Sequence, residues 1–137
     1  MTLNTERKYK GTVLVVEDSE DVRDVAVNML LNEGFRVLSA VDAISGLEKF
    51  KKHPNIDLVF TDLILPGGAS GIDLAKMILK ISRTTHILVT SGYRDKGEAL
   101  KSSTADFNNI SYVPKPYDVD KLPNIIHSLI KKTAFPR

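Results

Sequence analysis

The chain has 137 residues, no cysteine, and 19 Lys and Arg against 17 Asp and Glu, for a formal net charge of +2. This length fits one domain with a real hydrophobic core. The lack of cysteine excludes a disulfide scaffold, cysteine-ligated zinc, iron–sulfur clusters and thiol catalysis. The near-balanced charge argues against nucleic acid as the main ligand. Because no membrane-span or export pattern is visible either, we expect a cytoplasmic protein with no direct DNA binding and no membrane association.

Short apolar runs alternate with longer amphipathic runs along the chain. β-branched and aliphatic residues predict strands at Thr12–Val16, Phe35–Ala40, Ile56–Thr61, Ile87–Thr90 and Tyr112–Val113. Helical spacing of apolar residues predicts helices at Asp21–Asn32, Ala43–Lys52, Ile72–Ser82 and Lys96–Ser103, and a last helix with Leu122, Ile125, Ile126, Leu129 and Ile130 on one face. This alternation predicts an α/β domain at 11–132, a parallel sheet with helices on both faces. We expect residues 1–10 to be flexible and 133–137 to form a tail.

Polar side chains follow four of the predicted strands. Glu17 and Asp18 follow the first, Asp62 the third, Thr90 and Ser91 the fourth, and Lys115 the fifth. Because ligands of open parallel sheets bind at the carboxyl ends of the strands, we expect these side chains to meet at one edge.

The chemistry of that edge favours a metal and a phosphoryl group. Three carboxylates repel one another, and a divalent cation relieves the repulsion. All-oxygen ligands select a hard ion such as Mg²⁺. A lysine ammonium and a hydroxyl complete the groups that stabilise a phosphoryl group in transit, and a carboxylate beside them can act as the nucleophile.

Each residue alone has an ordinary explanation. Asp18 or Ser19 could cap the following helix, and Asp62 could cap a loop. Thr90 or Ser91 could form a turn, and Lys115 could be a solvated surface lysine. The coincidence of all of these groups at the correct strand ends favours a site.

With these residues in place, the sequence resembles the receiver domain of bacterial two-component response regulators, from about Gly11 to Lys132. The resemblance is carried by Val15–Asp18, Val59–Pro66, Ile87–Tyr93 and Tyr112–Tyr117. The residues of the segments Pro66–Gly71 and Thr90–Tyr93 look most like those of receivers of hybrid histidine kinases. The resemblance implies a doubly wound (βα)5 flavodoxin-like sandwich with strand order 2-1-3-4-5.

The resemblance also implies roles. Asp62 would be the phosphoacceptor, taking the phosphoryl group from a phosphohistidine of a sensor histidine kinase or phosphotransfer domain. Mg²⁺, with Mn²⁺ as the alternative, would be held by Asp18, Asp62 and the backbone carbonyl of Ile64. Glu17, which stands where the family usually has Asp, would act mainly through a metal-bound water.

Three further residues take roles from the resemblance. Lys115 would pair with Asp62 and then with the phosphoryl group, next to a cis Lys115–Pro116 bond. Ser91 would be the switch hydroxyl because a small residue follows it, with Thr90 as the fallback. Tyr112 would be the coupled aromatic side chain.

No effector domain follows Lys132 in this sequence. We therefore expect output through a downstream protein target that binds helix four, strand five and helix five, a face that could also join two copies of the chain. A receiver cut from a longer hybrid kinase is the alternative.

Two other classes fit less well. A haloacid-dehalogenase-like phosphohydrolase expects a second Asp at the position of Ile64. A flavodoxin-like cofactor binder needs a phosphate-cradling loop where Glu17 and Asp18 stand. A degenerate receiver is disfavoured because every required group is present.

Overall fold

The structure is a computed structural model that describes residues 9–92 and 107–134. Its strands are β1 (Thr12–Val16), β2 (Arg36–Ala40), β3 (Leu58–Asp62), β4 (His86–Ser91) and β5 (Ile110–Pro114). Its helices in these ranges are α1 (Glu20–Asn32), α2 (Ala43–Lys52), α3 (Gly71–Ile81) and α5 (Leu122–Ala134). The helix predicted at Lys96–Ser103 lies outside the described residues, as do most of the N-terminal segment and tail predicted to be flexible.

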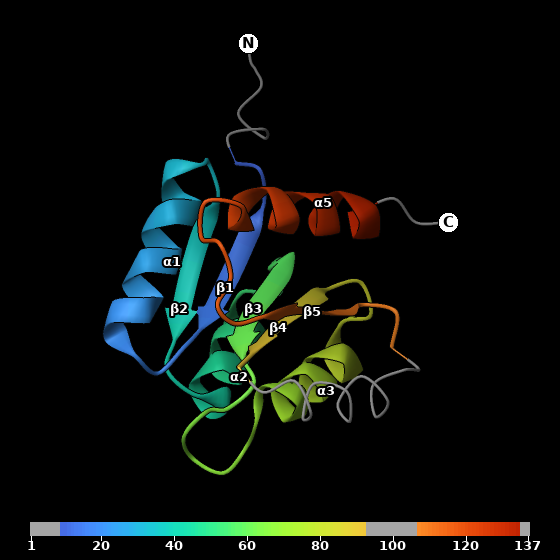
Figure 1. The fold of residues 1–137 in the computed structure, drawn as a ribbon. Helices are drawn as coiled ribbons and strands as arrows, with labels where there is room; N and C mark the ends of the chain where they lie inside the picture. Colours follow the sequence, from blue (N-terminus) through green and yellow to red (C-terminus); the bar gives the residue numbers. More distant parts are fainter. Residues whose placement is uncertain (1–8, 93–106, 135–137) are drawn as a thin grey trace.

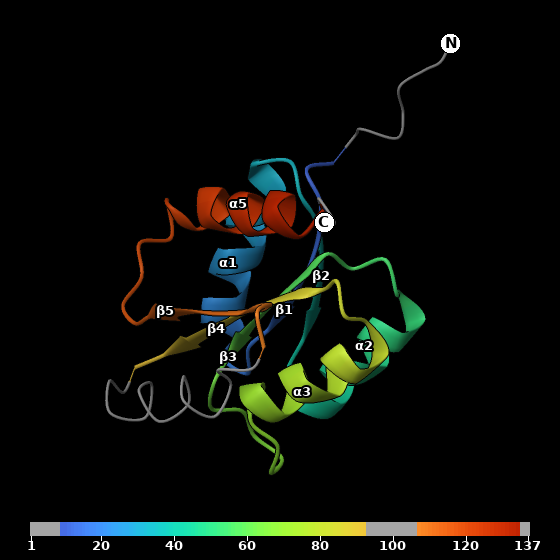
Figure 2. The same cartoon turned by 90° about the vertical axis from the view of Figure 1, so that its right-hand side faces the viewer.

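The sheet has five parallel strands in the order β2-β1-β3-β4-β5. Helices α1 and α5 cover one face and α2 and α3 cover the other, as the two views in Figures 1 and 2 show. The predicted fold class and strand order are therefore confirmed. The reversal of strand order between β1 and β3 places the expected ligand crevice at their carboxyl ends.

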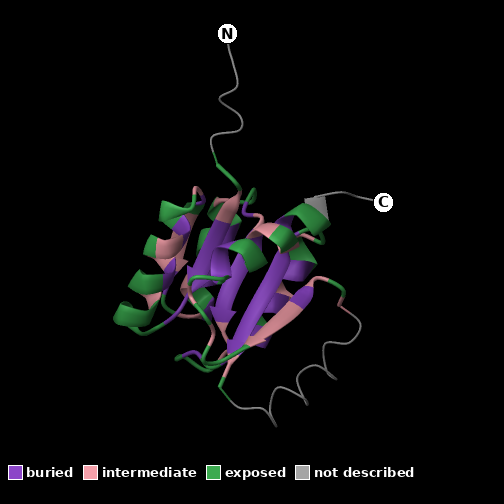
Figure 3. Ribbon diagram, turned by 45° about the horizontal axis from the view of Figure 1, so that its top comes forward, coloured by how far each residue is buried: buried purple, intermediate pink, exposed green. Residues whose placement is uncertain are grey.

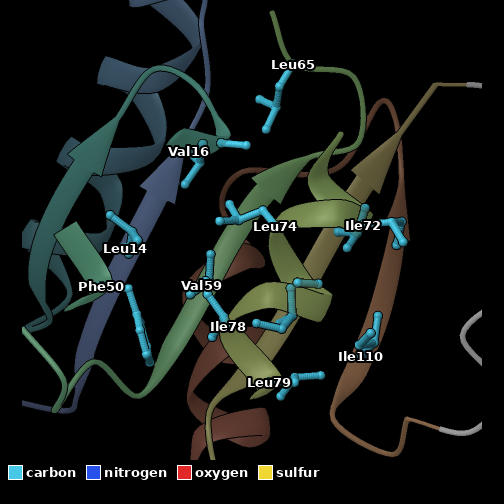
Figure 4. Packing of buried hydrophobic residues seen from close by; sticks show 14 of the residues in the cluster. Leu14, Val16, Phe50, Val59, Leu65, Ile72, Leu74, Ile78, Leu79 and Ile110 are labelled. Atoms are coloured by element: carbon cyan, nitrogen blue, oxygen red, sulfur yellow. The ribbon is translucent and has the colours of Figure 1, made fainter. Parts of the chain in front are cut away.

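Alternating side chains of the strands fill two hydrophobic cores. Leu14, Val59 and Val89 belong to the core under α2 and α3, where Figure 4 shows helix side chains directed at the sheet. Val15 and Phe60 belong to the core under α1 and α5. Figure 3 shows the result: the central strands are buried, and the outward faces of the helices are exposed. Because both faces are covered, the central strands are continuously apolar.

Side-chain caps begin the helices that follow the strands. The Ser19 hydroxyl accepts a hydrogen bond from the Val22 N–H at the start of α1. Asp42 and Ser70 form capping boxes with the third residues of α2 and α3. Since Ser19 is the cap of α1, the carboxylate of Asp18 is not needed for that purpose.

The observed bounds of the five strands and of α1, α2 and α3 all lie within two residues of the predicted ones. β5 differs most in length, because it runs from Ile110 to Pro114 rather than only over Tyr112–Val113. It lies at the edge of the sheet, and only its first residue is fully buried. A half-exposed edge strand with a serine and a proline carries little of the continuous apolar pattern that marks the inner strands.

None of the helices in the described ranges has the length and apolar character that crossing a membrane requires.

A buried histidine joins the amino ends of β4 and β5. The His86 side chain is 3% exposed. Its Nε2 lies 2.8 Å from the Ser111 hydroxyl, and its buried Nδ1 has no hydrogen-bond partner among the described residues. Burial, with the positive charge of Lys132 on α5 adding to it, lowers the pKa of His86 to about 4. His86 is therefore neutral in the folded protein at pH 7.

This histidine predicts an acid-sensitive stability. Between its folded pKa of about 4 and the ordinary value of 6.5, the unfolded chain binds the proton and the folded chain does not. The contribution of His86 to the free energy of unfolding is present above the ordinary pKa and is lost as the pH falls. From about pH 7 to about pH 5 we expect a loss of about 2 kcal/mol.

Urea denaturation of the wild type and of His86→Gln at both pH values measures this loss. The glutamine variant should lack it. The raised pKa of Glu17, described below, acts in the opposite direction but is common to both proteins, so it cancels in the difference. Equal pH dependence in the two proteins would contradict the assignment to His86.

Candidate functional site

The predicted site residues meet at the carboxyl ends of the strands. Asp62 is the last residue of β3 and Ser91 the last of β4, while Asp18 and Lys115 follow β1 and β5 closely. These four line one open cavity of about 660 Å³ together with Ile64, Leu65, Pro66 and Gly92. The β3–α3 loop, which carries Ile64, Leu65 and Pro66 of the lining, projects at the bottom of Figure 1. The fold therefore brings the separate sequence signals together.

Asp62 and Lys115 form an ion pair at the centre of this cavity. Lys115 Nζ lies 3.0 Å from Asp62 Oδ2. The Asp62 side chain is 12% exposed and that of Lys115 is 36% exposed, so the pair is accessible from solvent but shielded on the carboxylate side. The Ile64 N–H donates to Asp62 Oδ1 at 3.3 Å. Both carboxylate oxygens of Asp62 are thus oriented by contacts within the chain.

Two further carboxylates, those of Glu17 and Asp18, lie beside this pair. Glu17, Asp18 and Asp62 each offer an oxygen within 4.8 Å of the others. Burial raises the pKa of the Glu17 carboxyl above its ordinary value; the Ser19 N–H lowers it, and the negative charge of Asp62 raises it again. Negative charges this close together in a partly buried position favour binding of a divalent cation that takes oxygen ligands. The donor set therefore suits Mg²⁺ or Mn²⁺ and lacks the nitrogen and sulfur ligands that favour zinc.

Several backbone and side-chain contacts hold the turn that carries Glu17 and Asp18. The Glu17 N–H donates to the Ala40 carbonyl at 3.0 Å, and Glu17 Oε2 accepts the Ser19 N–H at 2.9 Å. Arg23 Nη1 on α1 donates to the Glu17 carbonyl at 2.9 Å. The sequence carries no signal for this role of Arg23, because a contact to a backbone carbonyl does not depend on which residue supplies the carbonyl.

The two adjacent hydroxyls of β4 have different surroundings. Thr90 is 3% exposed, and its hydroxyl has no hydrogen-bond partner among the described residues. Ser91 is half-buried and lines the cavity with Asp62 and Lys115. Strand alternation directs the two side chains to opposite faces of the sheet. Of the two residues, Ser91 is the one that lines the cavity, and its role as the switch hydroxyl stays a prediction.

Two tyrosines flank the site on β5 and after it. Tyr112 is half-buried and packs against the core under α2 and α3. Tyr117 contacts Phe60 edge to face, with ring centroids 5.6 Å apart and an interplanar angle of 81°. Burial raises the pKa of the Tyr117 phenol, and the charges of Glu17 and Asp62 raise it further. Tyr117 thus lies near the site, although no role is predicted for it from the sequence. The peptide bond between Lys115 and Pro116 is cis, as predicted.

A family model described as the response regulator receiver domain matches residues 13–127. The chain belongs to this family. A curated relative, the sensory transduction protein RegX3 of Mycolicibacterium smegmatis, is 34% identical over 123 residues, which are 90% of this chain and 52% of RegX3. The chemotaxis protein CheY of Treponema pallidum is 32% identical over 121 residues, 87% of this chain and 82% of CheY.

A solved receiver structure agrees with the family assignment. The crystal structure of the receiver domain from the hybrid histidine kinase CckA has a TM-score of 0.73 and 29% identity, covering 88% of this chain and 99% of that one. The predicted likeness to hybrid-kinase receivers is supported in part, because RegX3 and CheY match at higher identity. The chain spans about half the length of RegX3 and of several other curated relatives. Membership in the receiver family decides against the dehalogenase-like and flavodoxin-like alternatives.

Proposed function

We propose that this receiver domain accepts a phosphoryl group on Asp62 from the phosphohistidine of a sensor histidine kinase or phosphotransfer domain. The observation that supports this best is the Lys115–Asp62 contact of 3.0 Å in a cavity that Asp18 also lines, with an oxygen of Glu17 within 4.8 Å of the Asp62 and Asp18 carboxylates. A lysine that pairs with one oxygen of a shielded carboxylate is well placed to stabilise the negative charge that develops when the carboxylate becomes an acyl phosphate.

Mg²⁺ is the proposed cofactor, with Mn²⁺ as a substitute. Asp18, Asp62 and the backbone carbonyl of Ile64 would hold the ion, and Glu17 would act through its water shell. When bound, the ion offsets the charge of the carboxylates and of the incoming phosphoryl oxygens. The mutual distance of the three carboxylates, within 4.8 Å, supports a shared ligand.

The transfer itself moves one phosphoryl group and needs no other reactant. A carboxylate oxygen of Asp62 attacks phosphorus, the bond from phosphorus to the donor nitrogen breaks, and the electron pair of that bond leaves with the imidazole. Lys115 then pairs with a phosphoryl oxygen, and the Ser91 hydroxyl donates to another. We propose a signalling switch rather than an enzyme, because the phosphoryl group on Asp62 would itself be the signal until it is hydrolysed or passed on.

A largely apolar groove beside the site suits a docking phosphodonor domain. The groove has a volume of about 720 Å³ and shares Lys115 and Gly92 with the site cavity. Its walls include Val22 and Val25 of α1, which are 41% and 53% exposed, and Tyr117 and Val119 beyond β5. Apolar side chains exposed next to a reactive carboxylate favour a protein donor that buries them on contact.

For output, we propose that phosphorylation moves Ser91 and the half-buried Tyr112, which changes the surface around β5 and α5. A downstream protein target or a second copy of the chain would read this surface. The stretch expected to form helix four lies outside the described residues. We also propose a cytoplasmic location. The alternative is that this chain is the receiver unit of a larger hybrid kinase, and the similarity to the CckA receiver supports that alternative.

Incubation with Mg²⁺ and acetyl phosphate tests the proposal by intact mass. The wild type is expected to gain one acid-labile phosphoryl group only when Mg²⁺ is present, because Asp62 and its cation partners supply all the required groups. The matched variant Asp62→Asn, which keeps the shape of the side chain but removes its nucleophilic charge, should gain none. Equal labelling of both proteins, or of neither, would contradict Asp62 as the phosphoacceptor.

A further inference from the structure

Asp18 is exposed, so few side-chain contacts hold it in place, and the backbone fixes the point and direction from which its side chain starts. Its peptide bond to Glu17 is part of the turn between β1 and α1. The Glu17 N–H is fixed to β2 through the Ala40 carbonyl, at 3.0 Å. On the other side, Arg23 Nη1 donates to the Glu17 carbonyl at 2.9 Å. This carbonyl and the Asp18 N–H belong to one planar peptide group, so a contact that fixes the carbonyl also fixes the start of Asp18.

We propose that Arg23 is a positioning residue of the metal site: its guanidinium fixes the peptide group between Glu17 and Asp18 and thereby directs the Asp18 carboxylate toward the ion. The inference rests on the proposed Mg²⁺ site. Arg23 lies in the second turn of α1 and is half-buried, and its own N–H donates to the Ser19 carbonyl at 2.9 Å. The same residue thus links the rigid helix to the turn at two points.

The role is one of hydrogen bonding rather than of charge. A positive side chain near three carboxylates competes with a cation, so its removal alone would strengthen metal binding. Positioning and charge therefore predict opposite changes in metal affinity when Arg23 loses its charged group.

The test measures metal affinity directly on the full chain. Loss of the free Mn²⁺ signal in electron paramagnetic resonance gives Mn²⁺ affinity, and competition gives Mg²⁺ affinity. Arg23→Met keeps the aliphatic stem but no donor, and we expect it to bind either ion about tenfold more weakly, the usual scale for loss of a group that orients a metal ligand. Arg23→Lys, which keeps a donor, should recover most of this loss.

Arg36→Met is the matched control, because Arg36 is exposed at the amino end of β2, away from the site. Its affinity should equal that of the wild type or be slightly higher. Phosphorylation of Arg23→Met by acetyl phosphate should be slow at low Mg²⁺ and approach the wild-type rate at saturating Mg²⁺. If Arg23→Met does not fold by circular dichroism, Arg23→Gln replaces it, and we expect an affinity between those of the wild type and a donorless side chain.

Wild-type or tighter affinity in the Arg23 variant would overturn the positioning role while leaving the proposed function intact. The same is true if the lysine variant shows no recovery. Absence of Mn²⁺ and Mg²⁺ binding in the wild type would instead contradict the proposed metal site itself, so the two failures are distinguishable.

Discussion

Replacement of Lys115 by Met is expected to slow phosphoryl uptake by Asp62 by about 10²–10³-fold, the scale on which a pre-positioned electrostatic partner acts in a shielded site. The ammonium is 3.0 Å from Asp62 Oδ2, and the carboxylate is only 12% exposed, so solvent replaces this contact poorly. Methionine keeps most of the side-chain length and removes the charge. The rate is measured with acetyl phosphate at saturating Mg²⁺.

The same variant should bind the metal more tightly, although it is phosphorylated more slowly. Without Lys115, the cluster of Glu17, Asp18 and Asp62 has lost a cation, and Coulomb's law predicts tighter Mg²⁺ binding. Lys121→Met, at an exposed position before α5, is the matched control and should change neither quantity. A Lys115→Met protein that is phosphorylated at the wild-type rate would contradict the role of Lys115.

Replacement of Gly71 by Ala is expected to lower the free energy of unfolding by about 3 kcal/mol or more, at the upper end of the overpacking range. A Cβ at this position would clash with the Asp62 carbonyl oxygen and would lie 3.1 Å from the carbonyl carbon. Both atoms are backbone and cannot turn away. The Gly71 N–H also donates to the Leu63 carbonyl at 2.8 Å, so the start of α3 is fixed against the end of β3.

Urea denaturation measures this effect, and Gly92→Ala is its control in the same site. Among the described residues, a Cβ at Gly92 meets only Lys115, at 3.9 Å, which is an ordinary contact. Gly92→Ala should therefore keep near wild-type stability. If Gly71→Ala were equally stable, α3 would not be packed against Asp62 as the structure shows. We also expect Gly71→Ala to take up phosphoryl groups more slowly, because relief of the clash displaces the backbone of Asp62.

The inner elements could be predicted closely from local pattern. β1 and α2 begin and end at the predicted residues, because a continuous aliphatic run and an amphipathic run between Asp42 and His53 mark their bounds. The meeting of Asp18, Asp62, Ser91 and Lys115 could be predicted as well, since in a parallel sheet residues after different strands share one edge.

The contacts through backbone atoms could not be predicted. The hydrogen bond from Arg23 to the Glu17 carbonyl and the close approach of Gly71 to the Asp62 carbonyl depend on how helices sit on the sheet. An arginine at a helical position is more often a solvated side chain, and a glycine in a glycine-rich loop is ordinarily read as a turn residue. The short prediction for β5 has a similar cause, because edge strands lack the apolar pattern of buried ones.

The central claim, that Asp62 itself carries the phosphoryl group, is tested most directly by locating the acyl phosphate. Borohydride reduces an acyl phosphate to an alcohol, so it converts a phosphorylated aspartate into homoserine, which peptide mass spectrometry places in the sequence. After incubation with Mg²⁺ and acetyl phosphate, we predict homoserine at position 62 and at no other aspartate. Homoserine at Asp18 or elsewhere, or a wild type with unmodified Asp62 that nevertheless carries acid-labile phosphate, would contradict the account.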